Sequence, residues 1–145
     1  MIEMFTDGAC RGNPGPGGWG VLLLQDGQEI VLSGAELNTT NNRMELAAAI
    51  NGLAHVAQAS QIALTTDSQY VRQGITQWIQ GWRRNGWRTS SKQPVKNQDL
   101  WQALDREATK HEVSWHWVKG HSGHPGNERA DALANLAIDN LLRAS

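Results

Sequence analysis

The first third of the chain alternates short apolar runs with turn signals, a pattern typical of β-strands. One apolar run covers Ile2 to Asp7, and two more cover Trp19–Leu24 and Glu29–Ser33. Asp26 and Gly27, between the last two runs, form a typical two-residue hairpin turn. The pattern predicts three strands that meet through tight turns as an antiparallel meander.

The apolar spacing then changes to that of helices and back again. Four N-cap candidates, residues 39–42, precede apolar residues that recur at helical intervals, namely Leu46, Ile50, Leu53 and Ala57. The strand-like run Ile62–Thr66 follows, and a second helix is predicted from Asp67 onward. This strand, helix, strand succession predicts a parallel, right-handed crossover.

The second half of the chain adds one strand and two further helices. Glycines and Pro94 interrupt residues 74–97, which predicts irregular or broken helix. We expect a helix over Asp99–Lys110, a strand over Glu112–Val118 and a final helix over Asn127–Leu142. Trp101, Trp115 and Trp117 are predicted core residues. The whole, residues 1–145, is expected to be one α/β domain: a five-stranded mixed sheet, three antiparallel strands then parallel strands, flanked by helices.

Composition limits the classes of protein that this chain can be. It has 145 residues, of which 39% are hydrophobic, enough for one domain with a core. No apolar run approaches the roughly 20 residues of a membrane helix, and the N-terminus does not resemble a secretory signal. The single cysteine, Cys10, excludes an internal disulfide framework and fits a reducing compartment. We therefore expect a cytoplasmic protein without a membrane partner, and no Cys/His spacing indicates a zinc site.

Charge is distributed unevenly around a net value of −1. No acidic residue lies between Asp67 and Asp99, an interval that holds six of the thirteen Lys and Arg residues and three of the seven tryptophans. These residues are Arg72, Arg83, Arg84, Arg88, Lys92 and Lys96, with Trp78, Trp82 and Trp87. Such a basic patch indicates a polyanionic partner, although a solvated charged face is the commoner explanation of a charge run. The interleaved tryptophans favour the partner.

Acidic residues stand at the ends of several predicted elements. Asp7 and Asp67 each end an apolar strand, Glu45 lies in the first turn of a predicted helix, and Asp131 lies about one turn into the last one. If the first and fourth strands are neighbours, Asp7 and Asp67 lie side by side at the carboxyl ends of the sheet. Clustered carboxylates raise one another's pKa unless hard divalent cations such as Mg²⁺ compensate their charge.

The stretch after Asp7 is unusually rich in small and rigid residues. Eight of the thirteen residues from Gly8 to Gly20 are Gly or Pro. Little side-chain bulk there would leave room above Asp7 for a polymer backbone. Each acid also has a simpler explanation: Asp67 could cap a helix, and Glu45 could interact with a helix dipole. Spacing alone does not bring the acids together.

Four segments resemble the defining motifs of type 1 ribonuclease H, in order and over essentially the whole chain. They are "FTDGACRGNPGPGGWG", "TTNNRMELAA", "TDSQYVRQGI" and "WVKGHSGHPGNERADALA". Residues 74–97 resemble the basic protrusion of the bacterial type. The resemblance implies a ribonuclease H-like fold and largely sequence-independent hydrolysis of the RNA strand of RNA/DNA hybrids. It also implies two Mg²⁺ ions, or Mn²⁺ in their place, in-line attack by water and products with 5′-phosphate and 3′-hydroxyl ends. The carboxylate set is then Asp7, Glu45, Asp67 and Asp131.

The same resemblance assigns a loop histidine. His121, between Gly120 and Gly123, matches the family's catalytic loop histidine and could carry a proton or help product leave. The other histidines are expected to be structural or surface residues. Asn127 lies four residues before Asp131, so its amide could orient Asp131 or a metal-associated water, or it could be a helix N-cap.

Recognition of a hybrid requires the 2′-hydroxyls to be detected in the minor groove. The resemblance implies that Cys10, Asn13, Asn41 and Gln69 face the RNA strand and that Thr40 and Asn42 face the DNA strand. The protrusion would hold the DNA backbone, with Trp78 and Trp82 against sugars. The remaining substrate-binding set is Arg83, Arg84, Arg88, Lys92, Lys96, Asn97 and Asn127. Cys10 could equally be a small packing residue, and Trp78 could pack the protrusion onto the body.

The chain departs from the family pattern at two positions. Asn38 replaces a residue that is basic in many relatives, which weakens a phosphate pocket, and Gly126 replaces a frequent glutamate, which loosens the His121 loop. We expect a monomer without an obligate protein partner or a separate hybrid-binding module. Two rival functions are a non-catalytic nucleic-acid-binding module and a transposase- or resolvase-like nuclease of the same fold. The intact acids and His121 argue against the first, and Asn41, Asn42 and Gln69 argue against the second.

Overall fold

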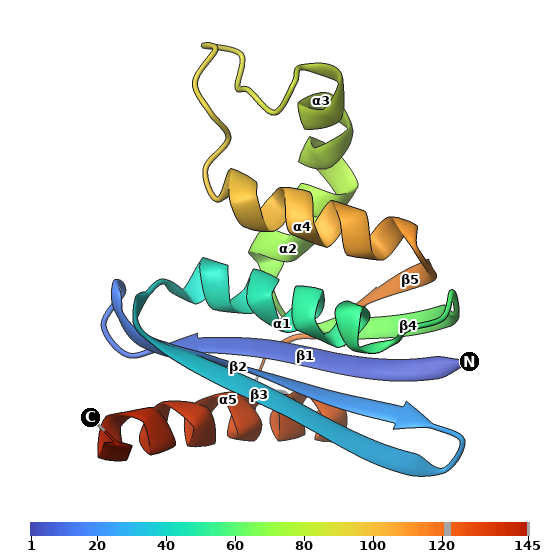
Figure 1. The fold of residues 1–145 in the computed structure, drawn as a ribbon, viewed down its shortest axis with the longest axis vertical. Coiled ribbons are helices and arrows are strands. Elements are labelled where there is room, and N and C mark those ends of the chain that lie inside the picture. Colours follow the sequence, from blue (N-terminus) through green and yellow to red (C-terminus); the bar gives the residue numbers. More distant parts are fainter. Residues whose placement is uncertain (121–122, 145) are drawn as a thin grey trace.

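A mixed five-stranded sheet runs through the centre of the protein (Figure 1). The computed structural model describes residues 1–120 and 123–144. The strands lie in the order β3-β2-β1-β4-β5, and β1, β2 and β3 are antiparallel while β4 and β5 run parallel to β1. Their bounds are β1 Ile2–Cys10, β2 Gly15–Gln25, β3 Gln28–Thr39, β4 Gln61–Thr66 and β5 Glu112–Trp117. The predicted fold class is confirmed.

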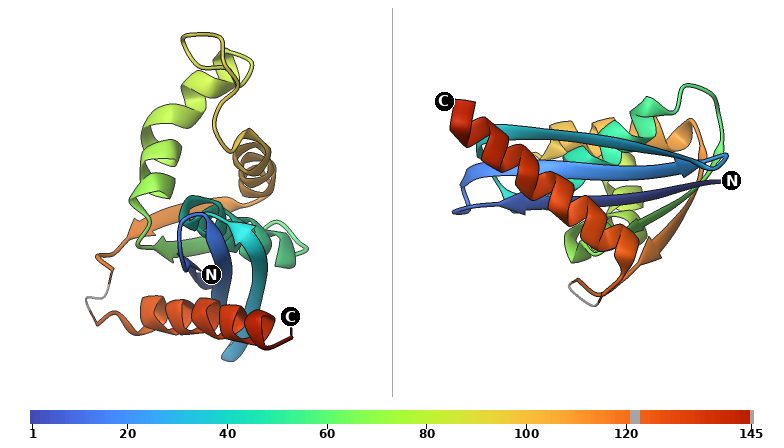
Figure 2. Two further views of the ribbon diagram at one scale, coloured as in Figure 1. Left: turned by 90° about the vertical axis from the view of Figure 1, so that its left-hand side faces the viewer. Right: turned by 90° about the horizontal axis from the view of Figure 1, so that it is seen from below.

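Helices cover both faces of this sheet (Figures 1 and 2). The long helix α5, Pro125–Ala144, lies alone on one face, and the other helices lie on the opposite face. Those helices are α1 Asn41–His55, α2 Gln69–Gln73, the π-helical segment η1 Gly74–Trp78, α3 Ile79–Arg84 and α4 Gln98–Thr109. The break expected in residues 74–97 takes the form of this π-helical segment and the turns that follow α3. None of the described helices has the length and apolarity needed to cross a membrane.

The first hairpin turn is as predicted, but its strands are longer. Asp26 and Gly27 both have positive φ, at 52° and 75°, and Gln25 pairs with Gln28, which defines a two-residue turn. The predicted strands ended early because glycines carry no apolar side chain that would continue the pattern. Their backbone nevertheless continues the ladder, since Gly18 pairs with both Ala9 and Ala35.

The glycines of β1 and β2 allow helices to approach the sheet closely. A Cβ atom at Gly18 would overlap the backbone carbonyl of Ala134, and one at Gly20 would overlap that of Ala130, both in α5. A Cβ atom at Gly8 would overlap the backbone of α1 on the opposite face. Helices α1 and α5 therefore occupy the space beside these three glycines. Room for a polymer backbone above the rest of this stretch stays a prediction.

The core lies between the sheet and the helices α1 and α4. Its fully buried side chains include Met4, Leu23, Leu53, Leu64 and Leu104. Trp101 of α4 is also fully buried, which confirms its prediction as a core residue. Trp115 and Trp117 of β5 are only partly buried and lie at the edge of this core with their rings stacked.

Replacement of Gly20 tests the close packing of α5. We expect Gly20→Ala to lower the free energy of unfolding by about 1–3 kcal/mol, because the new methyl group meets the α5 backbone, which cannot shift freely. Gly81→Ala is the matched control, since nothing lies within 4 Å of a Cβ atom there and the site is helical. Urea unfolding should show this variant unchanged or more stable by about 0.5–1 kcal/mol. Equal destabilisation of both variants would contradict the packing argument.

Candidate active site

Parallel pairing of β1 with β4 brings Asp7 and Asp67 to the same level of the sheet. The last paired residues are Phe5 of β1 and Thr65 of β4. Asp7 lies two residues after Phe5, and Asp67 lies two residues after Thr65. The expectation that the two strands are neighbours and place these acids side by side is confirmed. Asp7 does not end its strand, however, because β1 continues to Cys10 along β2, with Asp7 opposite Gly20.

Helix α1 supplies the third acid from a position deeper than predicted. The hydroxyl of Thr40 caps the helix by accepting a hydrogen bond from the backbone N–H of Arg43 at 3.2 Å. Helix α1 begins at Asn41, so Glu45 lies beyond the first turn, and the simple interaction with the helix dipole does not account for it. Its carboxylate instead accepts a hydrogen bond from the backbone N–H of Gly8 in β1.

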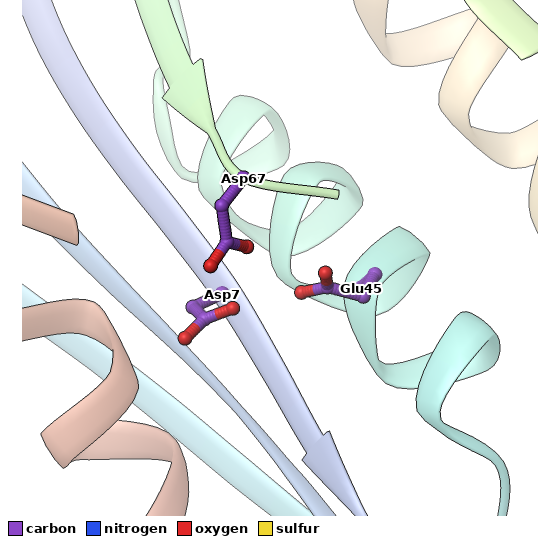
Figure 3. A group of neighbouring side chains, drawn as sticks. All are labelled: Asp7, Glu45 and Asp67. Carbon is purple, nitrogen blue, oxygen red and sulfur yellow. The ribbon is translucent and has the colours of Figure 1, made fainter. Parts of the chain in front are cut away.

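Three of the carboxylates converge (Figure 3). Ligand oxygens of Asp7, Glu45 and Asp67 lie within 4.8 Å of one another. Asp131 lies six residues after Pro125 in α5, about half a turn further into its helix than predicted, because α5 begins before Asn127. It stands outside the tight group but lines the same pocket of about 390 Å³, where Asn135 donates to its main-chain oxygen at 3.0 Å and to its carboxylate at 3.4 Å. All four acids therefore share one pocket.

Burial and mutual repulsion make Asp7 and Glu45 weak acids. Asp7 and Glu45 are 5% and 6% exposed. Burial raises the pKa of Asp7 to about 11, with further contributions from the charges of Glu45 and Asp67. Burial also raises the pKa of Glu45 to about 8, against hydrogen bonds from Asp7 and Gly8 that lower it. The pair thus holds on to protons at neutral pH. These closely spaced hard oxygen donors would repel one another once deprotonated, so they fit a hard divalent cation that compensates their charge.

Asn127 interacts with an acid other than the expected one. Its side chain is buried, and its Nδ2 donates to Asp67 Oδ2 at 3.3 Å. It is not the helix N-cap either, because the ring of His124 accepts a hydrogen bond from the Asn127 backbone N–H at 3.2 Å and Pro125 begins the helix. Its Oδ1 has no hydrogen-bond partner among the residues that the structure describes. Asn127 therefore orients Asp67 and adds a buried, unpaired oxygen.

Several of the predicted substrate residues surround this pocket. Asn41, Asn42 and Gln69 line it together with the acids. Asn13 Oδ1 accepts a hydrogen bond from the Asn41 backbone N–H at 3.1 Å, which joins the β1–β2 loop to α1. Cys10 is partly buried, and its Sγ lies 3.3–3.5 Å from three carbonyl oxygens, those of Gly12, Gly15 and Thr39. These contacts support the packing explanation for Cys10.

The protrusion, residues 74–97, carries a second, apolar hollow of about 330 Å³. Trp78, Trp82 and Lys96 line it together with Tyr70. The ring of Trp78 lies 6.0 Å from that of Tyr70 and 5.7 Å from that of Trp82, so Trp78 also packs the protrusion onto the body. The exposed basic residues are Arg83, Arg84, Arg88, Lys92 and Lys96. Arg83 pairs with Asp105 of α4, and the side chain of Asn97 is bonded to Arg43 and Tyr70. These hydrogen bonds give Asn97 a structural role, and its contact with the substrate stays a prediction.

The predicted loop histidine, His121, lies outside the described residues. Its neighbour Gly120 is described, and a Cβ atom there would lie 2.7 Å from Asp67 Oδ2, so the lack of a side chain lets the backbone of Gly120 lie close to this acid. Gly126 allows similarly close packing, because a Cβ atom there would overlap the ring of Phe5. Asn38 is exposed on β3. Sequence reasoning missed Gly8 and Tyr70, although both stand next to motif acids.

The raised pKa values predict how stability depends on pH. The pKa values of Asp7 and Glu45 in the folded protein lie above their unfolded values of about 4, so folding takes up protons and the free energy of unfolding falls as pH rises. Asp7→Asn removes one of these acids and should stabilise the metal-free protein by about 1–3 kcal/mol at pH 8 and by less at pH 5.

Urea unfolding in the presence of a chelator measures this difference. The matched control is Asp26→Asn in the exposed hairpin turn, which should leave the pH profile of the parent unchanged. Addition of Mg²⁺ should stabilise the parent more than Asp7→Asn. A variant less stable than the parent at pH 8 would mean that the carboxylates do not repel one another as inferred.

Comparison with known proteins agrees with the fold. A family model described as RNase H matches residues 1–139. A protein named Ribonuclease H from Nitrosococcus oceani is 64% identical over 140 residues, which cover 97% of this chain and 95% of that protein. The crystal structure of LC9-RNase H1, a type 1 RNase H with the type 2 active-site motif, is 35% identical with a TM-score of 0.85 and covers 96% of this chain and 72% of that one. LC11-RNase H1, solved in complex with RNA/DNA hybrid, shares the fold at 24% identity and a TM-score of 0.75, covering 98% of this chain and 99% of that one. The chain therefore belongs to the RNase H family, as a type 1 ribonuclease H.

Proposed function

We propose that this protein is a metal-dependent endoribonuclease that hydrolyses the RNA strand of RNA/DNA hybrids. The observation that carries the proposal is the single pocket lined by Asp7, Glu45, Asp67 and Asp131, with the polar side chains of Asn41, Asn42 and Gln69 beside them. Relatives named Ribonuclease H and a structure of the same fold solved with an RNA/DNA hybrid support it.

The four carboxylates would hold two Mg²⁺ ions, or Mn²⁺ in their place. Two such ions would lower the pKa of the attacking water and stabilise the charge that develops on the leaving oxygen. The chain's own groups keep the acids in place: Gly8 N–H holds Glu45, Asn127 holds Asp67 and Asn135 holds Asp131. Water attacks the phosphodiester in line, and the products carry 5′-phosphate and 3′-hydroxyl ends.

Two surfaces divide the recognition of the hybrid. The amides of Asn41 and Gln69 stand beside the acids, where they can hydrogen-bond 2′-hydroxyls that only the RNA strand carries. Asn42 lines the same pocket and faces the DNA strand. The exposed basic side chains of the protrusion contact phosphates of the DNA strand, which carry no base information, so cleavage is largely sequence-independent. His121 carries a proton or assists product release in this scheme. We further propose that the enzyme acts as a cytoplasmic monomer.

Cleavage of a hybrid labelled on either the RNA or the DNA strand, with and without Mg²⁺, tests the function. The parent should cut only the RNA strand and only with the metal. Asp7→Asn should lower the rate more than about a hundredfold while hybrid binding persists, because it removes a metal ligand worth several kcal/mol. Asp26→Asn is the control and should retain full activity. Hybrid binding without cleavage by the parent would favour a binding module, and preferential cutting of plain DNA duplex would favour a transposase-like nuclease.

Salt dependence tests the part of the proposal that concerns the protrusion. Arg84→Gln combined with Lys96→Gln should reduce the slope of log K against log salt concentration by about 0.9 for each phosphate that the variant no longer neutralises. Arg143→Gln near the end of α5, on the opposite face of the sheet, removes a charge away from the protrusion and should leave the slope unchanged. Hybrid affinity measured by fluorescence anisotropy over a salt series gives the slopes, and equal slopes for all variants would refute this role.

A further inference from the structure

Tyr70 is shared by the carboxylate pocket and the apolar hollow of the protrusion. It is the second residue of α2 and lines the carboxylate pocket on one side. It also lines the apolar hollow of the protrusion together with Trp78 and Trp82. Its ring packs against Trp101 of the core, with ring centroids 5.3 Å apart. A movement of this side chain would therefore change both the carboxylate pocket and the hollow of the protrusion, where the proposed function places the hybrid.

Two hydrogen bonds hold the hydroxyl of Tyr70. Trp101 Nε1 donates to it at 2.9 Å, and Asn97 Nδ2 donates to it at 3.1 Å. Trp101 is fully buried, so its indole N–H depends on this acceptor, because an unsatisfied buried donor is costly. The phenol oxygen thus connects α2 to the first turns of α4.

Asn97 extends the connection to α1. It precedes α4 in the left-handed conformation with a φ of 59°, and its side chain does not cap the helix. Its Oδ1 instead accepts a hydrogen bond from Arg43 Nη1 at 3.2 Å. The same guanidinium donates hydrogen bonds to both carboxylate oxygens of Asp99, at 3.0 and 2.8 Å. This bidentate geometry fixes the orientation of the Arg43 side chain. It also holds the pKa of Asp99 below its usual value.

These bonds join the part of the chain that carries the acids to the end of the protrusion. Helix α1 bears Glu45, Asn41 and Asn42, while Asn97 is the last residue of the protrusion before α4. Figure 1 shows α4 lying over α1, with α3 and the loop of the protrusion standing above it. The network of Arg43, Asp99, Asn97 and Tyr70 therefore bridges α1, α2 and the start of α4.

We propose that Tyr70 is a positioning residue that sets the spacing between the carboxylate pocket and the basic protrusion. This inference rests on the proposed function. Two binding surfaces on a rigid frame deliver a bound strand to the reaction site in register, and freedom between them weakens the combined binding. A hybrid long enough to reach the protrusion depends on this spacing, whereas a short hybrid that fills only the carboxylate pocket does not.

Tyr70→Phe removes the hydroxyl alone and is the primary test. Loss of two hydrogen bonds should raise KM for a long hybrid about 3- to 10-fold, with kcat unchanged. For a short hybrid both constants should match those of the parent. A merely structural defect would lower the active fraction and hence kcat for both substrates. Direct contact of the hydroxyl with the substrate at the pocket would impair the short hybrid equally. Either result overturns the inference.

A second variant tests the network at its exposed end. Asp99→Asn keeps the fold of α4 but weakens the hydrogen bonds from Arg43, and it should raise KM for the long hybrid in the same direction as Tyr70→Phe but by less. Glu29→Gln is the matched control, because Glu29 forms a comparable exposed ion pair with Arg129 away from the protrusion. Equal effects of both variants contradict the inference.

If the parent cleaves neither hybrid with Mg²⁺, the proposed function fails and the inference falls with it. If the parent cleaves both and the length effect is absent, only the inference fails.

Discussion

The rest of the structure depends on carboxylates that are buried together against their own repulsion. Asp7 and Glu45 are almost inaccessible, and their oxygens lie close to those of Asp67. A free chain would separate these charges, so packing elsewhere must hold them in place. The parallel register of β1 and β4 places the two aspartates at one level, and the Gly8 N–H attaches Glu45 to β1. The resulting electrostatic repulsion is what a divalent cation relieves.

Glycines connect the packing of the fold to this site. Gly8 lets α1 lie against β1 so closely that Glu45 reaches Asp7, and Gly18 and Gly20 let α5 lie against β2 on the other face. Because α5 carries Asn127 and Asp131, its distance from the sheet decides where these side chains stand. The same small residues thus satisfy the core and set the geometry of the carboxylate pocket.

The protrusion and the carboxylate pocket are connected through shared side chains. Tyr70 lines both, and Trp101, buried in the core, anchors its hydroxyl. Specific binding of a long polyanion requires that its contacts be made at fixed separations, because each flexible joint between them costs entropy. The two hydrogen bonds from the Arg43 guanidinium to the Asp99 carboxylate hold α1 and α4 together, which removes one such flexible connection.

Local chemistry of the sequence determined the elements and their order, the hairpin at Asp26 and Gly27, and the motif acids. Apolar periodicity and turn residues are local signals, so they can be recognised without the fold. Only the tertiary structure decided that Asn127 bonds to Asp67, that Asn97 bonds to Tyr70 and Arg43, and that the glycines face helices. These are contacts between residues far apart in the chain, and their geometry depends on how closely each helix approaches the sheet, which no local pattern records.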